Sequence, residues 1–259
     1  TTNITGSEAW STAFTFSGDG GGTGLRVWKD FLFITGTAEL HVYGPLSGSP
    51  VLDQSTQWPT AIVADTVWHP MIVGQDDVLY GGSGRFMFSL SEVSGQNFDP
   101  TNTTTYTFAS AALDLPEDYR IRCIGELGKN LMLGTWKGTN VQDQKIADIF
   151  PWDRTSDDLN LPVRLSENGI HAMQSIKNLL YFFAGTEGKL YVTDGSSVQE
   201  LVKLPEQIVS LDSGSFIDIF PGAMIHHNGK ILFGLSAGGN TNTAHVWSYN
   251  LKTGALQIE

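Results

Sequence analysis

The sequence has a single cysteine, Cys123, and no long uninterrupted run of apolar residues. One cysteine excludes an intrachain disulfide, and no apolar run approaches the roughly 18 residues that a membrane-spanning helix needs. Charged residues are also scarce at 16% of the chain, and negative charge dominates, since 15 Lys and Arg against 27 Asp and Glu give a net charge of −12. We therefore expect neither specific nucleic-acid binding nor an anionic membrane as a partner.

The lone cysteine lies in the run Arg120-Ile121-Arg122-Cys123-Ile124. A nucleophilic role would require a paired histidine and a lowered thiol pKa, and no histidine is near it in the sequence. We expect a small buried core residue instead. The chain begins at Thr1 without a visible signal peptide, which leads us to expect a processed product or part of a longer chain.

In place of these features, the chain has a repeat. Five segments share a polar turn followed by a short apolar strand: Lys29-Asp30-Phe31-Leu32-Phe33, Asp76-Asp77-Val78-Leu79-Tyr80, Lys129-Asn130-Leu131-Met132-Leu133, Lys177-Asn178-Leu179-Leu180-Tyr181 and Gly229-Lys230-Ile231-Leu232-Phe233. Their first apolar residues, at 31, 78, 131, 179 and 231, are 47, 53, 48 and 52 residues apart. A near-constant step of this size indicates a repeated supersecondary unit.

The fourth copy shows the unit most clearly. It predicts four antiparallel strands at residues 169–173, 179–184, 189–193 and 198–202, joined by short turns such as Asp194-Gly195. Helix signals are nearly absent. Four-stranded units repeated at this spacing are typical of a β-propeller, in which each blade covers its neighbours around an axis.

We therefore predict an all-β fold: one β-propeller domain over residues 1–259, with about five four-stranded antiparallel blades. The expected blades cover residues 13–58, 59–117, 118–165, 166–212 and 213–259. An additional strand at residues 13–17 could close the ring by pairing with the last blade, or belong to a blade that lies upstream. The sequence leaves open a closed five-bladed ring and a slice of a larger propeller.

The polar residues do not form a catalytic or metal-binding motif. Glycosidase chemistry needs two carboxylates that flank the scissile bond, and no pair stands out among the acidic residues expected at blade edges: Asp65, Asp76, Asp148, Asp153, Asp194 and Asp218. The six histidines lack metal-ligand spacing, and the adjacent His226 and His227 would face opposite sides of a strand. We expect no catalytic residue, no metal and no cofactor.

The most distinctive local sequence is Ile149-Phe150-Pro151-Trp152-Asp153-Arg154. It has two interpretations, a packed corner with a local ion pair or an exposed aromatic platform for a sugar or protein partner. The other tryptophans expected near the rims have the same two interpretations. The predicted rim or partner contacts are Trp58, Trp68, Trp136, Trp152, Asp153 and Arg154.

The third and fourth copies resemble virion proteins of tailed bacteriophages. The resemblance is clearest over residues 120–205 and includes Leu133-Gly134-Thr135-Trp136-Lys137-Gly138, the segment from Ile149 to Arg154, Leu161-Pro162-Val163-Arg164 and Asn168-Gly169-Ile170. These segments look like the β-propeller parts of tail and nozzle-type proteins. The resemblance implies a rigid module in a multi-subunit particle and transfers no catalytic residue.

Three functions follow as expectations. The first is a non-catalytic structural or assembly module of a phage or virus particle, located in the virion, a homo-oligomer that contacts other virion subunits through its rim loops. The second is a carbohydrate- or receptor-binding propeller that recognises a host surface glycan or receptor, with an extracellular location. The third is a five-bladed glycoside hydrolase, for which two carboxylates should face each other across the axis.

Overall fold

The computed structural model describes residues 24–36, 38–52, 59, 61–62, 69–137, 146–155, 159–185, 188–204, 224–235 and 245–259. The predicted strand at residues 13–17 lies outside these ranges. Every regular element within them is a β-strand. The described part contains no helix that is long and apolar enough to cross a membrane.

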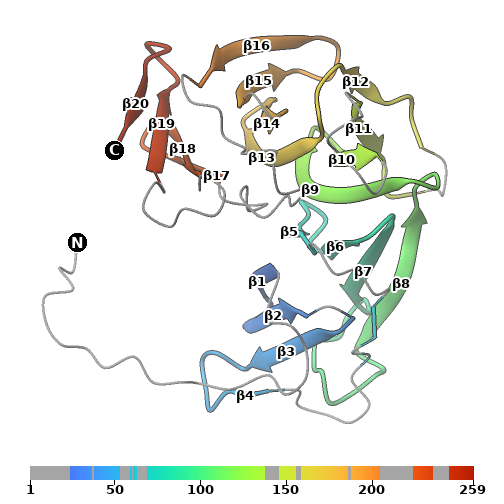
Figure 1. Ribbon diagram of the computed structural model, residues 1–259. Helices are drawn as coiled ribbons and strands as arrows, with labels where there is room; N and C mark the ends of the chain where they lie inside the picture. Colours follow the sequence, from blue (N-terminus) through green and yellow to red (C-terminus); the bar gives the residue numbers. More distant parts are fainter. Residues whose placement is uncertain are drawn as a thin grey trace, which may run out of the picture.

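Twenty strands form five four-stranded antiparallel sheets, and the predicted all-β, five-bladed propeller is confirmed (Figure 1). Blade 1 consists of β1 (Gly24–Trp28), β2 (Phe31–Thr35), β3 (Leu40–Gly44) and β4 (Val51–Leu52). Blade 2 consists of β5 (Met71–Val73), β6 (Leu79–Ser83), β7 (Phe86–Glu92) and β8 (Tyr106–Asp114). Blade 3 consists of β9 (Tyr119–Leu127), β10 (Asn130–Lys137), β11 (Ala147–Trp152) and β12 (Val163–Leu165).

The last two blades continue the pattern. Blade 4 consists of β13 (Ile170–Ile176), β14 (Leu179–Ala184), β15 (Lys189–Thr193) and β16 (Val198–Lys203). Blade 5 consists of β17 (Met224–His227), β18 (Lys230–Leu235), β19 (His245–Asn250) and β20 (Leu256–Ile258). Each sheet is built from consecutive strands, so every blade has four strands from its own repeat, the last blade included.

Tight turns set the register of the first hairpin in blades 1 and 5. Lys29 and Asp30 have φ of 50° and 67°, and Asn228 and Gly229 have φ of 48° and 73°. Two consecutive residues with positive φ form the turn whose twist matches paired antiparallel strands. The turns therefore join the first two strands of blades 1 and 5 directly.

The first strand of each blade is the innermost one. Contacts between blades connect β1 with β5, β5 with β9, β9 with β13 and β13 with β17, and Figure 1 shows these strands around the centre of the ring. The chain passes outward through each sheet before it starts the next blade. As a result, the axis is lined by one strand from each blade.

The core is divided into four clusters, one between each pair of consecutive blades. Phe33 and Val42 of blade 1 pack with blade 2, and the other clusters join blade 2 to 3, blade 3 to 4 and blade 4 to 5. Cys123 is buried in the cluster between blades 3 and 4, as the sequence predicted, and burial raises its thiol pKa. Apolar packing between faces therefore holds the consecutive blades together.

Candidate functional site

One rim of the propeller carries the turns between the first and second strands, and polar bridges connect neighbouring blades there. The Trp28 indole donates from Nε1 to the Asp77 carbonyl at 3.0 Å and to its carboxylate at 3.1 Å. The Gln75 amide donates to the Glu126 carboxylate at 2.9 Å, and the Glu126 amide donates to the Ser175 hydroxyl at 2.8 Å. These bridges recur about once per repeat, so they stabilise the ring and leave fewer polar groups for a ligand.

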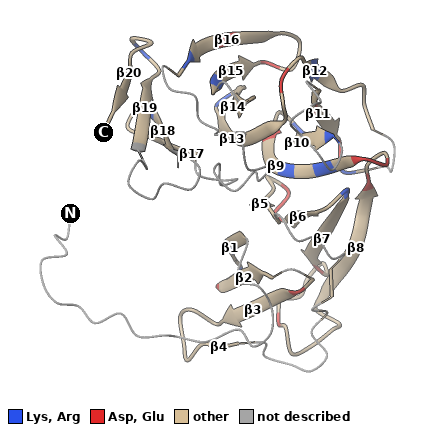
Figure 2. Ribbon diagram, in the orientation of Figure 1, with Lys and Arg blue, Asp and Glu red and all other residues tan. Residues whose placement is uncertain are grey.

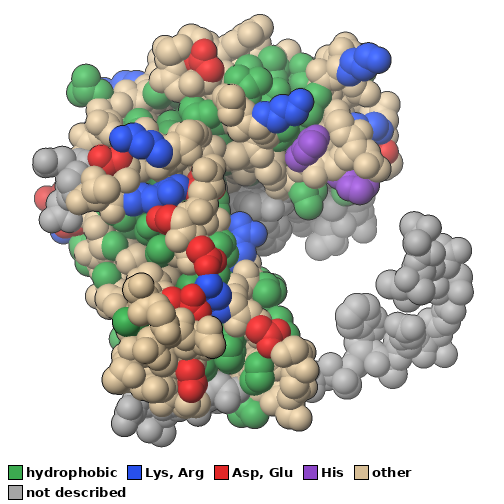
Figure 3. All heavy atoms as spheres, turned by 180° about the vertical axis from the view of Figure 1, so that it is seen from behind, with side chains coloured by type: hydrophobic (Ala, Val, Ile, Leu, Met, Phe, Trp, Pro, Cys, Tyr) green, Lys and Arg blue, Asp and Glu red, His purple; other side chains and the backbone are tan. Residues whose placement is uncertain are grey.

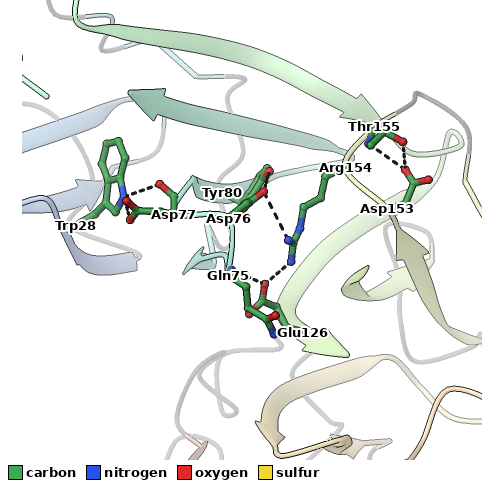
Figure 4. A network of polar contacts seen from close by, with 9 residues as sticks. All are labelled: Trp28, Gln75, Asp76, Asp77, Tyr80, Glu126, Asp153, Arg154 and Thr155. Atoms are coloured by element: carbon green, nitrogen blue, oxygen red, sulfur yellow. Dashed lines mark hydrogen bonds and ion pairs between the residues drawn. The ribbon is translucent and has the colours of Figure 1, made fainter. Parts of the chain in front are cut away.

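Arg154 belongs to the same network (Figure 4). Its guanidinium pairs with Glu126 and lies 3.6 Å from the Asp76 carboxylate of blade 2. Asp153 accepts hydrogen bonds from the amide and hydroxyl of Thr155 at 3.0 and 2.9 Å, which forms a local turn. The sequence predicted a local ion pair between Asp153 and Arg154. In the structure, Arg154 instead links blades 2 and 3, whereas Asp153 stabilises a turn.

The predicted tryptophan contacts are not exposed where the structure describes them. Trp136 is 6% exposed and Trp152 is 3% exposed, and Trp58 and Trp68 lie outside the described residues. Trp152 packs edge-on against Tyr80, because strand β11 continues through Pro151 to Trp152 where a corner was expected. β12 pairs with β11 only as far as Ile149. Pro151 lies beyond this point, so its missing N–H interrupts no described pairing between β11 and β12.

Two basic side chains are buried between blades 3 and 4. Arg122 and His171 each occupy the extra position of a β-bulge on an innermost strand, and each is 1% exposed. The Arg122 guanidinium lies 4.7 Å from the Trp136 ring centre. Burial lowers the pKa of Arg122 to about 9, and burial together with the nearby Arg122 charge lowers the pKa of His171 well below its ordinary value. Bulges often aim side chains toward functional regions.

Asp148 is a fully buried carboxylate on β11. Arg164 donates to it from Nε and Nη2, each at 2.8 Å, and the Tyr119 hydroxyl donates to it as well. Burial alone would raise the pKa of Asp148, but these hydrogen bonds outweigh burial and hold the pKa below its ordinary value. Asp148 therefore stays ionised as a structural anion within blade 3.

The other acidic candidates either accept hydrogen bonds from neighbouring residues or lie outside the described residues. Asp76 accepts a hydrogen bond from the Tyr80 hydroxyl at 2.8 Å. Asp194 accepts from the amide and hydroxyl of Ser196. Asp65 and Asp218 lie outside the described residues. Among the described residues, no group of three or more His, Cys, Asp or Glu side chains could hold a metal ion.

A pocket of about 300 Å³ lies on the axis, and every blade contributes to its lining. Its side chains are mostly apolar, with two polar ones, and include Leu25, Arg26, Met71, Ile124, Met173, Gln174, Met224 and Ile225. No carboxylate is found among the described lining residues. No sequence motif predicts this site, because each repeat contributes only two or three lining residues and these differ between copies.

The side of the ring between blade 1 and blade 5, called here the open side, exposes apolar residues. On β1, Leu25 is 66% and Val27 is 54% exposed, and on blade 5, Ile225 is 58% and Val246 is 48% exposed. The strands β2, β3 and β4 contain no Lys, Arg, Asp or Glu (Figure 2). Figure 3 shows the molecule hollowed between these two blades.

Comparisons with known proteins identify the fold. No family model and no curated protein matches the chain. An extracellular domain of a one-component system from B. thetaiotaomicron aligns with a TM-score of 0.54 and 10% identity over 97% of this chain and 36% of that one. A similar domain of a hybrid two-component system from the same organism aligns at 0.53 and 14%, over 88% and 28%.

A third similar structure is an enzyme, an exo-β-1,3-galactanase from Phanerochaete chrysosporium with β-1,3-galactotriose. It aligns with a TM-score of 0.51 and 9% identity over 97% of this chain and 65% of that one. At such low identity these similarities establish the propeller fold alone. The chain spans about a third of the length of the two sensor domains that it matches, and these neighbours do not bear out the resemblance to phage virion proteins.

Proposed function

We propose that this propeller is a non-catalytic structural module of a phage or virus particle and that a neighbouring copy of the chain covers its open side. The observation that carries the proposal is the exposure of Leu25, Val27 and Ile225 on two facing blades. Contiguous exposed apolar surface on a folded protein marks an interaction site. The resemblance of residues 120–205 to tail and nozzle-type proteins supports the assignment to a particle.

The register of blade 1 explains why its open face suits a protein partner. Leu25 pairs with Ile34, and Val27 pairs with Leu32, which pairs in turn with Tyr43. These side chains share the face that points away from blade 2, whereas Phe33 and Val42 share the face that packs on it. Blade 1 therefore has apolar residues on both faces. On the face that points away from blade 2, Leu25 and Val27 of β1 are exposed, whereas Ile34 is 1% exposed.

Charge also permits contact between copies at this side. Like copies with a net charge of −12 repel each other, yet blade 1 has no acidic residue on β1 to β4. On blade 5, Lys230 and Glu259 pair at 2.6 Å, which balances their charges. The open side is thus a nearly neutral surface on an acidic molecule.

A glycoside hydrolase is less well supported. That chemistry needs two carboxylates on either side of the scissile bond, and the described axial lining contributes none. A glycan-binding site would use exposed aromatic rings, but the described tryptophans, Trp28, Trp136, Trp152 and Trp247, are all at most 6% exposed. We therefore favour assembly.

The test is the mass of the purified chain in solution. Light scattering behind size exclusion should give oligomers whose proportion rises with concentration, and negative-stain electron microscopy should show a closed arrangement of copies. Leu25→Glu should shift the population to monomer, because a charge would have to be buried in the contact.

Val51→Glu is the matched control, since Val51 is 55% exposed on the outer strand β4 of the same blade. It should leave the oligomer unchanged. A monomer at all concentrations, or equal effects of the two variants, would refute the proposal.

A further inference from the structure

We propose that the loop between β7 and β8, residues 93–105, is a clasp that holds blade 1 against blade 2, and that blade 1 opens from the ring as a unit when the clasp is released. Its contacts lie within one copy, so the clasp does not depend on the proposed assembly role. Among the described residues, apolar clusters join blade 1 to blade 2 and to no other blade. The end of a repeat array has the fewest stabilising neighbours, so its attachment determines whether it stays docked.

The clasp is the longest connection between the third and fourth strands of any blade, and it is ordered by its own hydrogen bonds. The Val93 amide donates to the Thr105 carbonyl at 2.9 Å, which closes the base of the loop. The Thr105 hydroxyl accepts from the Asp99 amide at 3.0 Å and donates to the Asn102 carbonyl at 2.8 Å. Compact loops with adjoining ends and internal packing are frequently functional.

Phe98 is the side chain through which the clasp reaches blade 1. Residues 93–97 are exposed, whereas Phe98 is 7% exposed. Its ring centre lies 5.1 Å from that of Trp28, 5.2 Å from that of Phe31 and 5.8 Å from that of Phe33. Aromatic rings at such separations attract each other beyond the effect of the area that they bury. One side chain of blade 2 is thus inserted among three aromatic side chains of blade 1.

Glu92, the last residue of β7, connects the clasp to the first turn of blade 1. One carboxylate oxygen accepts from the Phe98 amide at 2.7 Å, and the other lies 2.7 Å from the Lys29 ammonium. Lys29 also pairs with Asp77 of blade 2, and the hydrogen bonds to Asp77 and Glu92 raise the pKa of Lys29. A single carboxylate therefore positions Phe98 and holds the turn onto which Phe98 packs.

These contacts determine how blade 1 opens. Proteins open locally in cooperative units that often coincide with supersecondary motifs, and a blade is such a unit. When Phe98 withdraws, Trp28 and Phe31 lose the ring that packs against both of them. The turn at Lys29 loses its second carboxylate when Glu92 moves with the loop. The clasp therefore sets the balance between docked and open states of blade 1.

The test is hydrogen exchange followed by mass spectrometry, with all variants made in a Leu25→Glu background so that contacts between copies do not contribute. Phe98→Ala should accelerate exchange in β1, β2 and β3 by at least about tenfold, because opening no longer removes a buried ring. Exchange in β9 and β13 should stay within about twofold. Phe98→Leu should act in the same direction with a smaller factor, and it keeps the test valid if Phe98→Ala does not fold.

Glu92→Gln tests the link to Lys29. It keeps an oxygen for the Phe98 amide but removes the charge that pairs with Lys29, and it should accelerate the same blade 1 amides by about two- to fivefold. Asp114→Asn is its matched control, because Asp114 pairs with Arg85 at 2.8 Å within blade 2. This control should leave blade 1 unchanged.

Phe150→Leu is the matched control for Phe98→Leu. Phe150 is 5% exposed and belongs to the cluster between blades 2 and 3, so its replacement should not accelerate β1 to β3. Equal acceleration in all five blades after Phe98→Ala, or none in blade 1, would overturn the clasp. An unchanged Glu92→Gln protein would overturn the role given to Glu92. Light scattering without the Leu25→Glu change reports assembly separately, so the failure of either proposal is distinguishable.

Discussion

At the scale of single residues, burial decides the role of the histidines. Their spacing in the sequence excluded a metal motif and suggested ordinary polar positions, yet His41, His69 and His171 are buried whereas His226 and His227 are exposed. His171 is buried at a bulge on β13, where it is the extra residue of the strand between Ile170 and Ala172. A sequence repeat locates the strand but does not reveal the bulge, since the inserted residue differs between copies.

We predict that His171 makes the protein less stable in mild acid. Its pKa is depressed in the folded state, so the unfolded chain binds more protons and stability falls as the pH drops below about 6.5. Urea unfolding at each pH should show a loss between pH 7 and pH 5 whose upper limit, set by the unfolded histidine, is about 2 kcal/mol. Asp148, with its lowered pKa, titrates in a more acidic range.

His171→Leu should abolish this part of the pH dependence, because it removes the titrating ring from the buried site. His226→Leu changes an exposed histidine on β17 and should retain it. Equal slopes in wild type and His171→Leu would show that another group is responsible.

At the scale of elements, the repeat predicted strands better than the packing between them. The second and third strands expected in the fourth copy, 179–184 and 189–193, coincide with β14 and β15, because alternation and turn residues define both ends. The sequence could not predict that β11 continues through Pro151, since that depends on how short its neighbour β12 is. It also could not predict which carboxylates bridge two blades, as the largely buried Glu126 does.

Close packing between blades predicts a cost for adding one methyl group at Gly134. A Cβ there would meet Cys123 Sγ at 2.5 Å, Met173 Cε at 2.7 Å and Ile170 Cγ2 at 2.8 Å. Gly134→Ala should lower the free energy of unfolding by about 1–3 kcal/mol, because the atoms that must move belong to the filled core between blades 3 and 4. Chemical denaturation measures the change.

Gly48→Ala is the control for the general effect of replacing glycine, since a Cβ at Gly48 would meet only Pro45 atoms at 3.4 Å or more. It should change stability by less than about 1 kcal/mol. If Gly134→Ala is as mild as Gly48→Ala, the packing between these blades is looser than the contacts indicate.

At the scale of the whole molecule, the described residues form four apolar interfaces between consecutive blades, and they form none between blade 1 and blade 5. The sequence predicted the number of blades because the period is regular, but it could not predict which faces are covered. That depends on the two ends of the repeat array, where Leu25 and Ile225 are exposed, and not on the period itself. A repeat array is stabilised mainly by interfaces between neighbours, so its ends are its weakest part.

The open side predicts uneven protection of backbone amides. β1 and β17 each have a neighbouring innermost strand on one side in the described structure, whereas β9 and β13 pack between two blades. In the unassembled chain, hydrogen exchange at β1 and β17 should therefore be faster than at β9 and β13 by at least about tenfold, because local opening there disrupts fewer buried contacts. In the oligomer, protection of β1 should rise while that of β9 stays constant, since the neighbouring copy covers Leu25 and Val27. Uniform protection in the isolated chain would mean that the ring is already closed and would remove the physical reason for assembly at this side.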